Sequence, residues 1–534
     1  MSSEEVKVNK SISPSHSHGR TAIFTISSNN YMPYSCTLID TSYAVHPEAD
    51  HFLCLADKIV PIQNFYPNHC TIVETRKLNI PDFYGFAFRY DIMEFNTAAK
   101  PFMFLYLFQL GYENVIYFDP DIKVYLPIKP VFDALDNGAS VVLTPHLTMP
   151  AETDTTPNDL TIMQAGIYNL GFVAFRRQNE VEEVLRWWAR RLRFQCINAQ
   201  AQGVFVDQKF VDLVPGFLDE VAILRTPTLN VAYWNLMQRE LKQGHDQWFV
   251  DSQPLIFFHF SGYDPRNSQR LSKYTCFFSS DNSPALQSLL EDYQSDLFER
   301  GLDQTPRAIF AYDRFASGAK IPTLARHVFR ENYLAWEGNP FETFQEHLEQ
   351  AAIGIPLGSN GSTCTNLMLG FWKSSSELQN TYNAHAPDGV ADLVRWFIRN
   401  SHLSKFDPRL MTRSLEELEN SSRHQRRRVS PRVADDDPDI SVIGYITTNS
   451  GVGEAGRRTI SALAAGARSV EGVDVSLNVV SSRDDRSCES FLREKALGRI
   501  QIFNINADQL PVVQDQMSGL LQRNAYRIAI PFWE

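Results

Sequence analysis

Residues 115–125 read VIYFDPDIKVY, a stretch that joins a buried apolar run to two acidic side chains, Asp119 and Asp121. Residues i and i+2 of an extended chain point to the same side, so both carboxylates can meet one ligand. In open α/β sheets, ligands lie at the carboxyl ends of the strands, where this pair falls. Two carboxylates suit Mg²⁺ or Mn²⁺, ions that proteins usually bind through carboxylates together with the phosphates of a substrate. The stretch predicts a site for a metal-bound nucleotide diphosphate; the alternative is an Asp-Pro-Asp turn that closes a strand.

Apolar runs with the length of strands recur on both sides of this stretch. They read TAIFTIS (21–27), HFLCLA (51–56), CTIVE (70–74), ASVVLTP (139–145), GFVAF (171–175) and LIFFHF (255–260). Helical patterns separate several of them, at 36–45, 97–111 and 180–193. Strands that alternate with helices predict an α/β domain with a mostly parallel, Rossmann-like sheet.

The 534-residue chain divides by composition into five segments. We expect a disordered leader at 1–20, the α/β domain at 21–275, a helical region at 276–424, a linker at 425–439 and a second Rossmann-like pattern at 440–534. The linker has a basic block before an acidic one, which favours a solvated tether over a binding patch. The second pattern stops after three or four strands, so we expect the front part of a longer protein.

Bulk composition excludes several classes of protein. The net charge of -12 argues against a general nucleic-acid-binding surface. The seven cysteines never occur in a CxxC spacing, which indicates neither a disulfide framework nor a zinc site and fits the cytoplasm. The leader has no apolar signal-peptide core, and the strongest apolar run, 102–110, is too short to span a membrane.

Two further segments carry polar side chains at strand ends. LIFFHFSG places His259, Ser261 and Gly262 after an apolar run, where the imidazole can complete a metal shell and the glycine allows close approach of phosphate. The first strand leads into Asn30 and Tyr31, which can hydrogen-bond and stack a base. The alternatives are a packed core histidine and a polar loop.

Six motifs now occur in a fixed order: IFTISSNNY, NTAAKP, VIYFDPD, YNLGFVAF, VDQKF and HFSG. Together they resemble the retaining glycosyltransferases of family 8, over roughly residues 21–265. The resemblance implies a GT-A fold, a UDP-sugar donor and Mn²⁺ or Mg²⁺ as cofactor. It implies that Asp119, Asp121 and His259 bind the metal and that Asp207 and Gln208 lie beside the anomeric carbon. The donor-binding positions that it implies are Thr25, Ser27, Asn30, Tyr31, Lys100, Asp119, Asn169, Gly171, Ser261 and Gly262.

The chain departs from the family pattern at two places. The Lys-Pro-Trp segment that usually follows the His-Gly motif is replaced by YDPRNSQR, in which Arg266 or Arg270 is a candidate substitute for the lysine. Ser28 stands where the family has an acid, so both UDP and GDP stay open as the nucleotide. Whether Asp207 or Gln208 acts as a nucleophile, or the acceptor attacks from the front face, also stays open.

A second glycine cluster, Gly451, Gly453 and Gly456, spells GxGxxG between an apolar run and a helical pattern. It fits a dinucleotide fingerprint weakly, because VDVSLNVV (473–480) is followed only late by an acid, Asp484. With FNINADQLP and PFWE, it resembles the N-terminal half of GT-B glycosyltransferases of family 4, which faces the acceptor and is inactive alone. Glycines that allow tight packing of helix on strand are the alternative.

We therefore expect a metal-dependent hexosyltransferase that acts with retention. Two transferase-like modules suggest bacterial surface polysaccharide synthesis (O-antigen or capsule), with an oligosaccharide or lipid-linked glycan as acceptor, partner glycosyltransferases and peripheral association with the cytoplasmic face of the inner membrane. The competing hypotheses are a nucleotide-diphosphate-sugar hydrolase or nucleotidyltransferase, and a non-catalytic glycan-binding or scaffold module.

Overall fold

The computed structural model describes most of the chain as two compact units, Met1–Asn420 and Ser421–Glu534. The described residues are 19–151, 157–267, 269–275, 283–303, 310–400, 406–410, 438–466, 469–476, 483–521 and 525–532. The predicted leader, apart from 19–20, and the predicted linker, apart from 438–439, lie outside them. No helix in these ranges combines the length and the apolar character that a membrane crossing needs.

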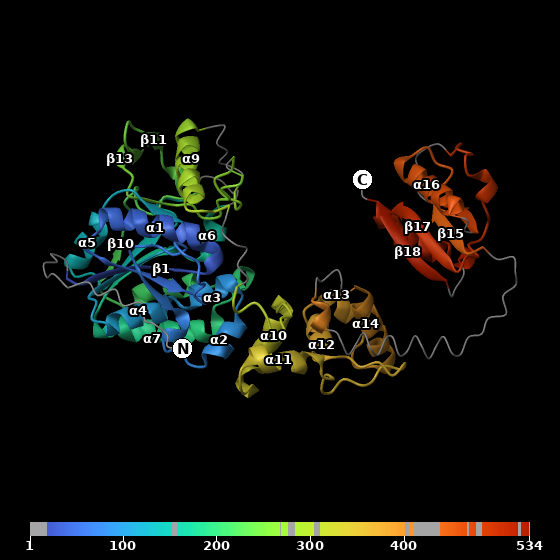
Figure 1. The fold of residues 1–534 in the computed structure, drawn as a ribbon, viewed down its shortest axis with the longest axis horizontal. Coiled ribbons are helices and arrows are strands. Elements are labelled where there is room, and N and C mark those ends of the chain that lie inside the picture. Colours follow the sequence, from blue (N-terminus) through green and yellow to red (C-terminus); the bar gives the residue numbers. More distant parts are fainter. Residues whose placement is uncertain are drawn as a thin grey trace. The chain divides into compact units, whose positions relative to one another are not determined.

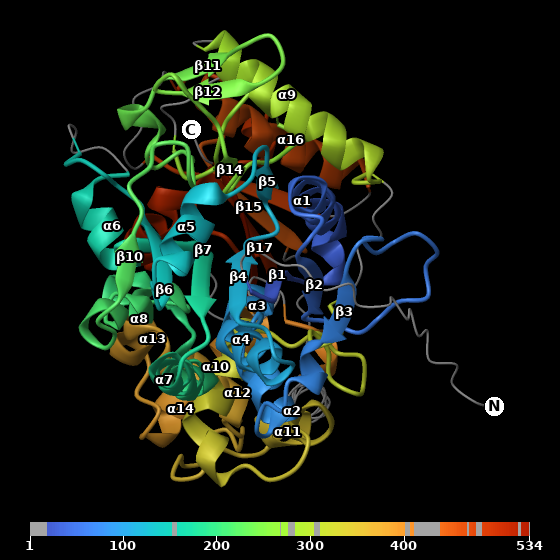
Figure 2. The same cartoon turned by 90° about the vertical axis from the view of Figure 1, so that its left-hand side faces the viewer.

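A seven-stranded sheet forms the centre of the first unit, in the order β10-β6-β7-β4-β1-β2-β3 (Figure 2). The strands are β1 Thr21–Ser27, β2 Asp50–Leu55, β3 Thr71–Glu74, β4 Asn114–Phe118, β6 Val141–Pro145, β7 Tyr168–Arg176 and β10 Val221–Ile223. All neighbouring pairs are parallel except those of β7, which runs antiparallel to β4 and β6. The predicted α/β fold with a mostly parallel sheet is confirmed.

Helices cover both faces of this sheet because its strands are apolar on both sides. Phe24 of β1 packs in one core with α4 (Lys100–Gln109) and α7 (Asn179–Gln195). Its neighbour Ile23 points to the other face and packs in a second core with α1 (Met32–Val45) and α5 (Lys129–Asp136). Figure 1 shows α1 and α5 on one side of the strands and α4 and α7 on the other.

Two predicted helices differ in extent from the observed ones, and proline explains both. The predicted helix 97–111 is two helices, α3 (Ile92–Ala98) and α4, because Pro101 lacks an N–H and fits only the first turn of a new helix. The helix predicted from residue 36 begins at Met32, with Pro33 in its first turn.

Small elements extend beyond the carboxyl end of β4. β5 (Ile122–Val124) pairs antiparallel with β14 (Phe257–His259), so the predicted strand 255–260 is not part of the main sheet. The other short elements are α2 Phe83–Arg89, α6 Asp159–Ala165, β8 Asn198–Ala199, β9 Val204–Phe205, α8 Gln208–Val211, β11 Leu241–Gln243, β12 Trp248–Val250 and β13 Gln253–Pro254. Figure 2 shows β5 and β14 above the end of β4.

The remainder of the first unit is helical. Its helices are α9 Pro284–Glu299, α10 Thr323–Asn332, α11 Pro340–Glu349, α12 Asn366–Lys373, α13 Ser376–Thr381 and α14 Pro387–Asn400. Phe329 of α10 and Phe344 of α11 pack edge-on against Phe88 of α2. Buried Arg326 donates to the carbonyls of Phe88 and Tyr312, at 2.8 Å each. The helices from α10 onward therefore share a core with the sheet domain.

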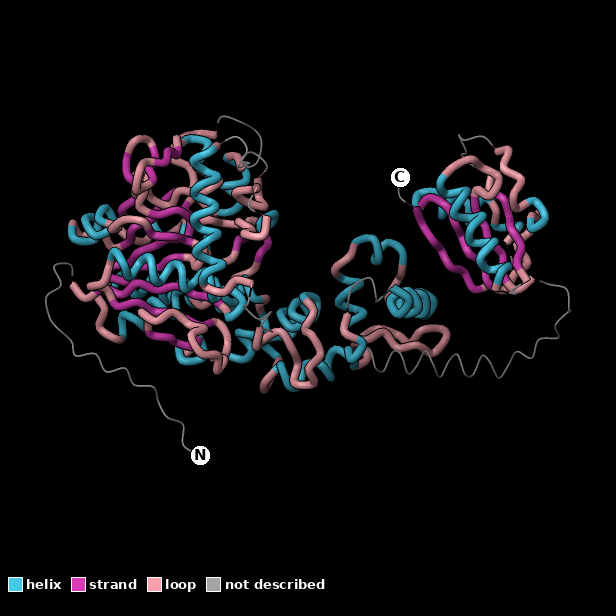
Figure 3. Tube along the Cα trace, turned by 45° about the horizontal axis from the view of Figure 1, so that its top comes forward, coloured by secondary structure: helices cyan, strands magenta, loops and turns pink. Residues whose placement is uncertain are grey.

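The second unit is a four-stranded parallel sheet in the order β16-β15-β17-β18. Its elements are β15 Ile440–Gly444, α16 Gly451–Ala465, β16 Val470–Asp474, β17 Ile500–Asn506, α17 Leu510–Gln516 and β18 Tyr526–Phe532. The strand predicted at 473–480 was placed too late: it is β16, and 477–480 lie outside the described residues. Figure 3 shows helices beside the strands of this unit.

Candidate active site

Asp119, Asp121 and His259 come together just beyond β4. Asp119 and Asp121 occupy the turn between β4 and β5, and the β5–β14 pairing sets His259 opposite Ile122. Nε2 of His259 lies 3.1 Å from Oδ1 of Asp121 and 3.7 Å from Oδ2 of Asp119. One ligand atom from each of the three residues lies within 4.8 Å of the other two. We call these three residues the triad.

The triad is open to solvent on its carboxylate side. The side chains of Asp119 and Asp121 are 29% and 16% exposed, whereas that of His259 is 3% exposed. Burial raises the pKa of Asp119, against the opposing charges of Lys100 and His259. Burial opposes a charge on His259, but Asp121 and then Asp119 outweigh it and raise its pKa. The two carboxylates stabilise positive charge at this point, and together with the imidazole they suit a divalent cation such as Mn²⁺ or Mg²⁺.

Gly171 in β7 leaves room for the imidazole of His259. A Cβ atom at this position would lie 2.3 Å from Cε1 of His259, closer than any real contact. The carbonyl of Gly171 accepts a hydrogen bond from the N–H of Asp119 at 2.7 Å. Gly171 therefore fixes one carboxylate ligand and makes space for the histidine.

Asp207 and Lys100 form a buried ion pair beside the start of β7. Nζ of Lys100 lies 2.5 Å from Oδ2 of Asp207, and both side chains are at most 3% exposed. The same Nζ donates to the carbonyl of Leu170 at 2.8 Å and lies 4.1 Å from the ring centre of Tyr117. Burial raises the pKa of Asp207, and Lys100 opposes that rise. Because Lys100 is engaged on several sides, a direct contact with the donor stays a prediction.

Gln208 and Asn169 connect this pair to the triad. Oε1 of Gln208 accepts from the N–H of Leu170 at 2.9 Å, and its Nε2 donates to the carbonyl of Ala165 at 3.0 Å. Asn169 lies between Gln208 and His259, with Nδ2 3.4 Å from Oε1 of Gln208 and Oδ1 3.2 Å from Nδ1 of His259. The structure thus brings together residues from separate sequence motifs: Asp207, Gln208, Asn169, Gly171 and the triad.

The first loop is arranged differently from what a stacking role for Tyr31 requires. Asn30 and Tyr31 are exposed, but the ring of Tyr31 stacks on Tyr34 at 4.4 Å. Although the residue as a whole is 39% exposed, desolvation of its hydroxyl and then the charge of Asp121 raise the pKa of Tyr31, which is consistent with a position beside the triad. The better anchored side-chain amide is that of Asn29, whose Nδ2 donates to the carbonyl of Lys58 at 2.9 Å and whose Oδ1 accepts from the hydroxyl of Tyr66 at 2.8 Å. Base binding by this loop stays a prediction.

The four remaining positions predicted to bind the donor are fully or partly buried. Thr25 is fully buried, and Ser27 is 2% exposed and accepts a hydrogen bond from Ser35. Ser261 and Gly262 are half-buried; Gly262 has a φ of +72°, and a Cβ there would meet Ser272 and Tyr274. Donor contacts at these four positions stay predictions.

Sequence reasoning missed a group of buried residues behind the triad: Thr144, His146, Asn230 and Trp234. The indole of Trp234 lies edge-on to both His146 and His259, with ring centres 5.1 Å apart in each case. His146 directly follows β6, at a strand carboxyl end like that of Asp119. The rule that selected Asp119 and Asp121 could therefore have selected His146.

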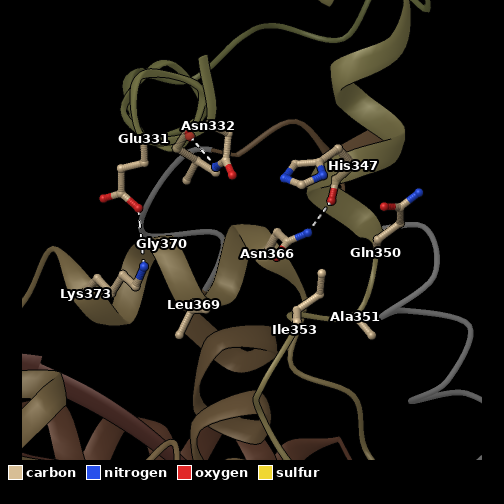
Figure 4. A pocket seen from close by; sticks show the side chains of 11 residues that line it. Glu331, Asn332, His347, Gln350, Ala351, Ile353, Asn366, Leu369, Gly370 and Lys373 are labelled. Atoms are coloured by element: carbon tan, nitrogen blue, oxygen red, sulfur yellow. Dashed lines mark hydrogen bonds and ion pairs between the residues drawn. The ribbon is translucent and has the colours of Figure 1, made fainter. Parts of the chain in front are cut away.

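A cavity of about 410 Å³ opens among α10, α11 and α12 (Figure 4). Its polar lining consists of Glu331, Asn332, His347, Gln350, Asn366 and Lys373. Two contacts in it are already made, one between Lys373 and Glu331 at 3.3 Å and one from Asn366 to the carbonyl of His347 at 2.9 Å. None of the triad residues lines it, so the triad is the better candidate for the chemistry.

In the second unit, the glycine cluster begins helix α16 and packs tightly. A Cβ on Gly453 would lie 2.5 Å from the carbonyl oxygen of Thr448, and the N–H of Gly453 donates to Ser450 at 3.1 Å. The acid at the end of β16 is Asp474, not Asp484, and it accepts hydrogen bonds from Thr447. These contacts support the packing alternative, since two N–H groups of the loop are already bonded.

Known proteins that are similar in sequence match only part of this chain, at 25–30% identity. No family model matches the chain. The protein YfnF of Bacillus subtilis, named as uncharacterized, is 30% identical over 152 residues, which are 28% of this chain and 50% of YfnF. YfnD of the same organism, also named as uncharacterized, is 25% identical over 236 residues, 42% of this chain and 73% of YfnD. The chain thus spans half the length of YfnF.

Solved structures that match part of the chain include glycosyltransferases. The galactosyltransferase LgtC, solved in complex with donor and acceptor sugar analogs, is 13% identical with a TM-score of 0.30. The match covers 52% of this chain and 95% of LgtC.

Proposed function

We propose that the first unit is a metal-dependent glycosyltransferase with a GT-A fold that transfers a hexose from a nucleotide-diphosphate sugar with retention. The observation that carries the proposal is the triad, in which Asp119 and Asp121 meet His259 from a distant part of the sequence at the carboxyl end of a strand. This position and this set of ligands suit a cation that shares the oxygens of a diphosphate. Lewis-acid stabilisation of the departing diphosphate is the chemistry that Mn²⁺ or Mg²⁺ would supply there.

The residues around the triad can orient the sugar. Gln208 and Asn169 are held by main-chain and side-chain hydrogen bonds, so their carboxamides are fixed before a substrate arrives. Asp207 is kept beside Lys100 rather than free to attack. This arrangement favours front-face attack guided by the leaving group, with Gln208 near the reacting carbon, over a covalent intermediate on Asp207.

The biological setting that we propose rests on the motif resemblance alone. The donor would be a UDP-sugar, with a GDP-sugar as the other choice, and the acceptor an oligosaccharide or lipid-linked glycan of a bacterial O-antigen or capsule. The second unit would be the acceptor-facing half of a GT-B module. Work with partner glycosyltransferases at the cytoplasmic face of the inner membrane belongs to the same proposal.

Calorimetric titration of UDP and GDP, with and without Mn²⁺, tests the proposal. We expect metal-dependent binding of one nucleotide, lost in Asp121→Ala and retained in Asp133→Ala, which removes an acid of an exposed helical ion pair. Metal-independent binding, or equal loss in both variants, would contradict the metal assignment. Sugar release from the matching donor should rise with a glycan acceptor; release that no acceptor stimulates would instead indicate a hydrolase.

A further inference from the structure

Two buried carboxamide oxygens face Nδ1 of His259, the nitrogen on the opposite side from the triad carboxylates. Oδ1 of Asn169 lies 3.2 Å away and Oδ1 of Asn230 lies 3.3 Å away. A carboxamide oxygen only accepts hydrogen bonds, so Nδ1 must carry the proton for either contact to form. In a neutral imidazole, Nε2 then keeps its lone pair.

The orientation of Asn169 is fixed from its far end. Nδ1 of His146 lies 3.3 Å from the carbonyl of Ile167, which can only accept, so His146 carries its proton on Nδ1. Nε2 of His146 therefore accepts, and Nδ2 of Asn169 faces it at 3.2 Å. Burial, which lowers the pKa of His146 to about 4, keeps this ring neutral near pH 7. Oδ1 of Asn169 is left to face His259, and it also accepts from the N–H of Gly171 at 3.1 Å.

Asn230 is oriented independently. Its Nδ2 donates to Oγ1 of Thr144 at 2.9 Å and to Oδ1 of Asn169 at 3.0 Å. The backbone carbonyl of Asn230 accepts from Nδ2 of Asn235 at 2.9 Å. The backbone has a φ of +49°, a region that asparagine tolerates better than most residues. With both amide hydrogens committed, its Oδ1 is turned toward His259.

We propose that His146, Asn169 and Asn230 form a hydrogen-bond chain that locks His259 in the Nδ1–H tautomer and aims the Nε2 lone pair between Asp119 and Asp121. The part of this inference that concerns the cation rests on the proposed metal site. His146 and Asn230 are positioning residues: both are buried, neither belongs to the triad, and they act through His259. Residues that orient a metal-binding histidine typically change metal affinity about 10- to 100-fold when removed.

Asn230→Gly tests the lock because glycine accepts the positive φ while removing the carboxamide. We expect calorimetry to show Mn²⁺ affinity reduced about 10- to 100-fold. Asn79→Gly is the matched control, since Asn79 also has a positive φ, +54°, and is exposed; it should bind Mn²⁺ as the wild type does. Thr144→Val, which removes one of the two acceptors of the Asn230 amide, should weaken Mn²⁺ binding less and serves if Asn230→Gly does not fold.

The tautomer itself is read from the imidazole nitrogens. In wild-type protein labelled with ¹⁵N-histidine, at a pH where the ring of His259 is neutral, we expect a protonated Nδ1 and an unprotonated Nε2, with His259→Gln used for assignment. Asn230→Gly should give mixed tautomers. A protonated Nε2 in the wild type, or unchanged Mn²⁺ affinity in folded Asn230→Gly, would overturn the inference. Absence of Mn²⁺ binding by the wild type would refute the proposed function, while the nitrogen shifts would still decide the tautomer.

Discussion

Replacing Lys100 by methionine separates a structural role of this lysine from a role in donor binding. Nζ of Lys100 lies 2.5 Å from Oδ2 of Asp207 and 2.8 Å from the carbonyl of Leu170, with both charged side chains almost fully buried. Methionine keeps most of the aliphatic volume, so little cavity forms. The main effect is a buried carboxylate without its partner, which costs about 3–5 kcal/mol of folding free energy.

The destabilisation by Lys100→Met should depend on pH, because it leaves the Asp207 carboxylate without a partner. Burial already raises the pKa of Asp207, and loss of Lys100 should raise it further. A carboxyl group whose pKa is higher in the folded state binds protons more readily there than in the unfolded chain, so folding gains stability as the pH falls. The destabilisation by Lys100→Met should therefore be largest near pH 7 and shrink toward pH 5. Lys100→Met/Asp207→Asn should recover more than half of the loss at pH 7.

Urea unfolding followed by tryptophan fluorescence measures the change. Every tryptophan except Trp533 belongs to the first unit, so the signal reports the unit that contains the pair. A loss below about 1 kcal/mol, within the range of an exposed pair, would refute the reasoning. So would a double variant no more stable than the single one. If Lys100→Met lost nucleotide affinity without losing stability, the donor-binding role would be favoured instead.

Three further changes test other parts of the structure. Gly171→Ala should reduce Mn²⁺ affinity at least about 10-fold in calorimetry, because the new Cβ displaces the imidazole of His259; unchanged affinity would contradict the packing. Arg326→Met should cost about 2–4 kcal/mol in urea unfolding, because buried carbonyls lose their donor; a loss under 1 kcal/mol would exclude that role. Since the pKa of His146 is about 4, the wild type should lose about 3 kcal/mol from this group as the pH falls from 6.5 to 4. His146→Gln should flatten that slope in urea unfolding across this range, while the contribution of His51 remains; an unchanged slope would contradict the lowered pKa.

Much of the fold follows from local sequence pattern. Apolar runs of strand length that alternate with helices predicted the strands of the main sheet except β10, since burial on both faces requires such runs. What local pattern could not give is which strands pair. LIFFHF has the same composition as the sheet strands, yet it pairs with β5 outside the main sheet. The direction of β7 also depends on tertiary contacts that no short segment encodes.

Some residues of the candidate site could be predicted from local sequence pattern, and others could not. The two acids of Asp-Pro-Asp were found because they follow an apolar run, and His259 because its motif occurs in a known order. Asn230 and Trp234 lie in an irregular segment without periodicity, so no pattern selects them. Their importance depends on burial and on which polar atoms they meet, properties that exist only once the chain is folded.

The antiparallel direction of β7 explains how one short segment can serve both the triad and the buried ion pair. Because β7 runs opposite to β4 and β6, its first residues lie at the carboxyl ends of those strands, in register with Phe118 and Pro145. From there, Gly171 accepts from Asp119 and makes room for His259, while the carbonyl of Leu170 accepts from Lys100. A parallel strand would have placed its polar start at the far end of the sheet. The reversal thus puts consecutive residues of one strand in contact with both halves of the site, through two adjacent peptide carbonyls.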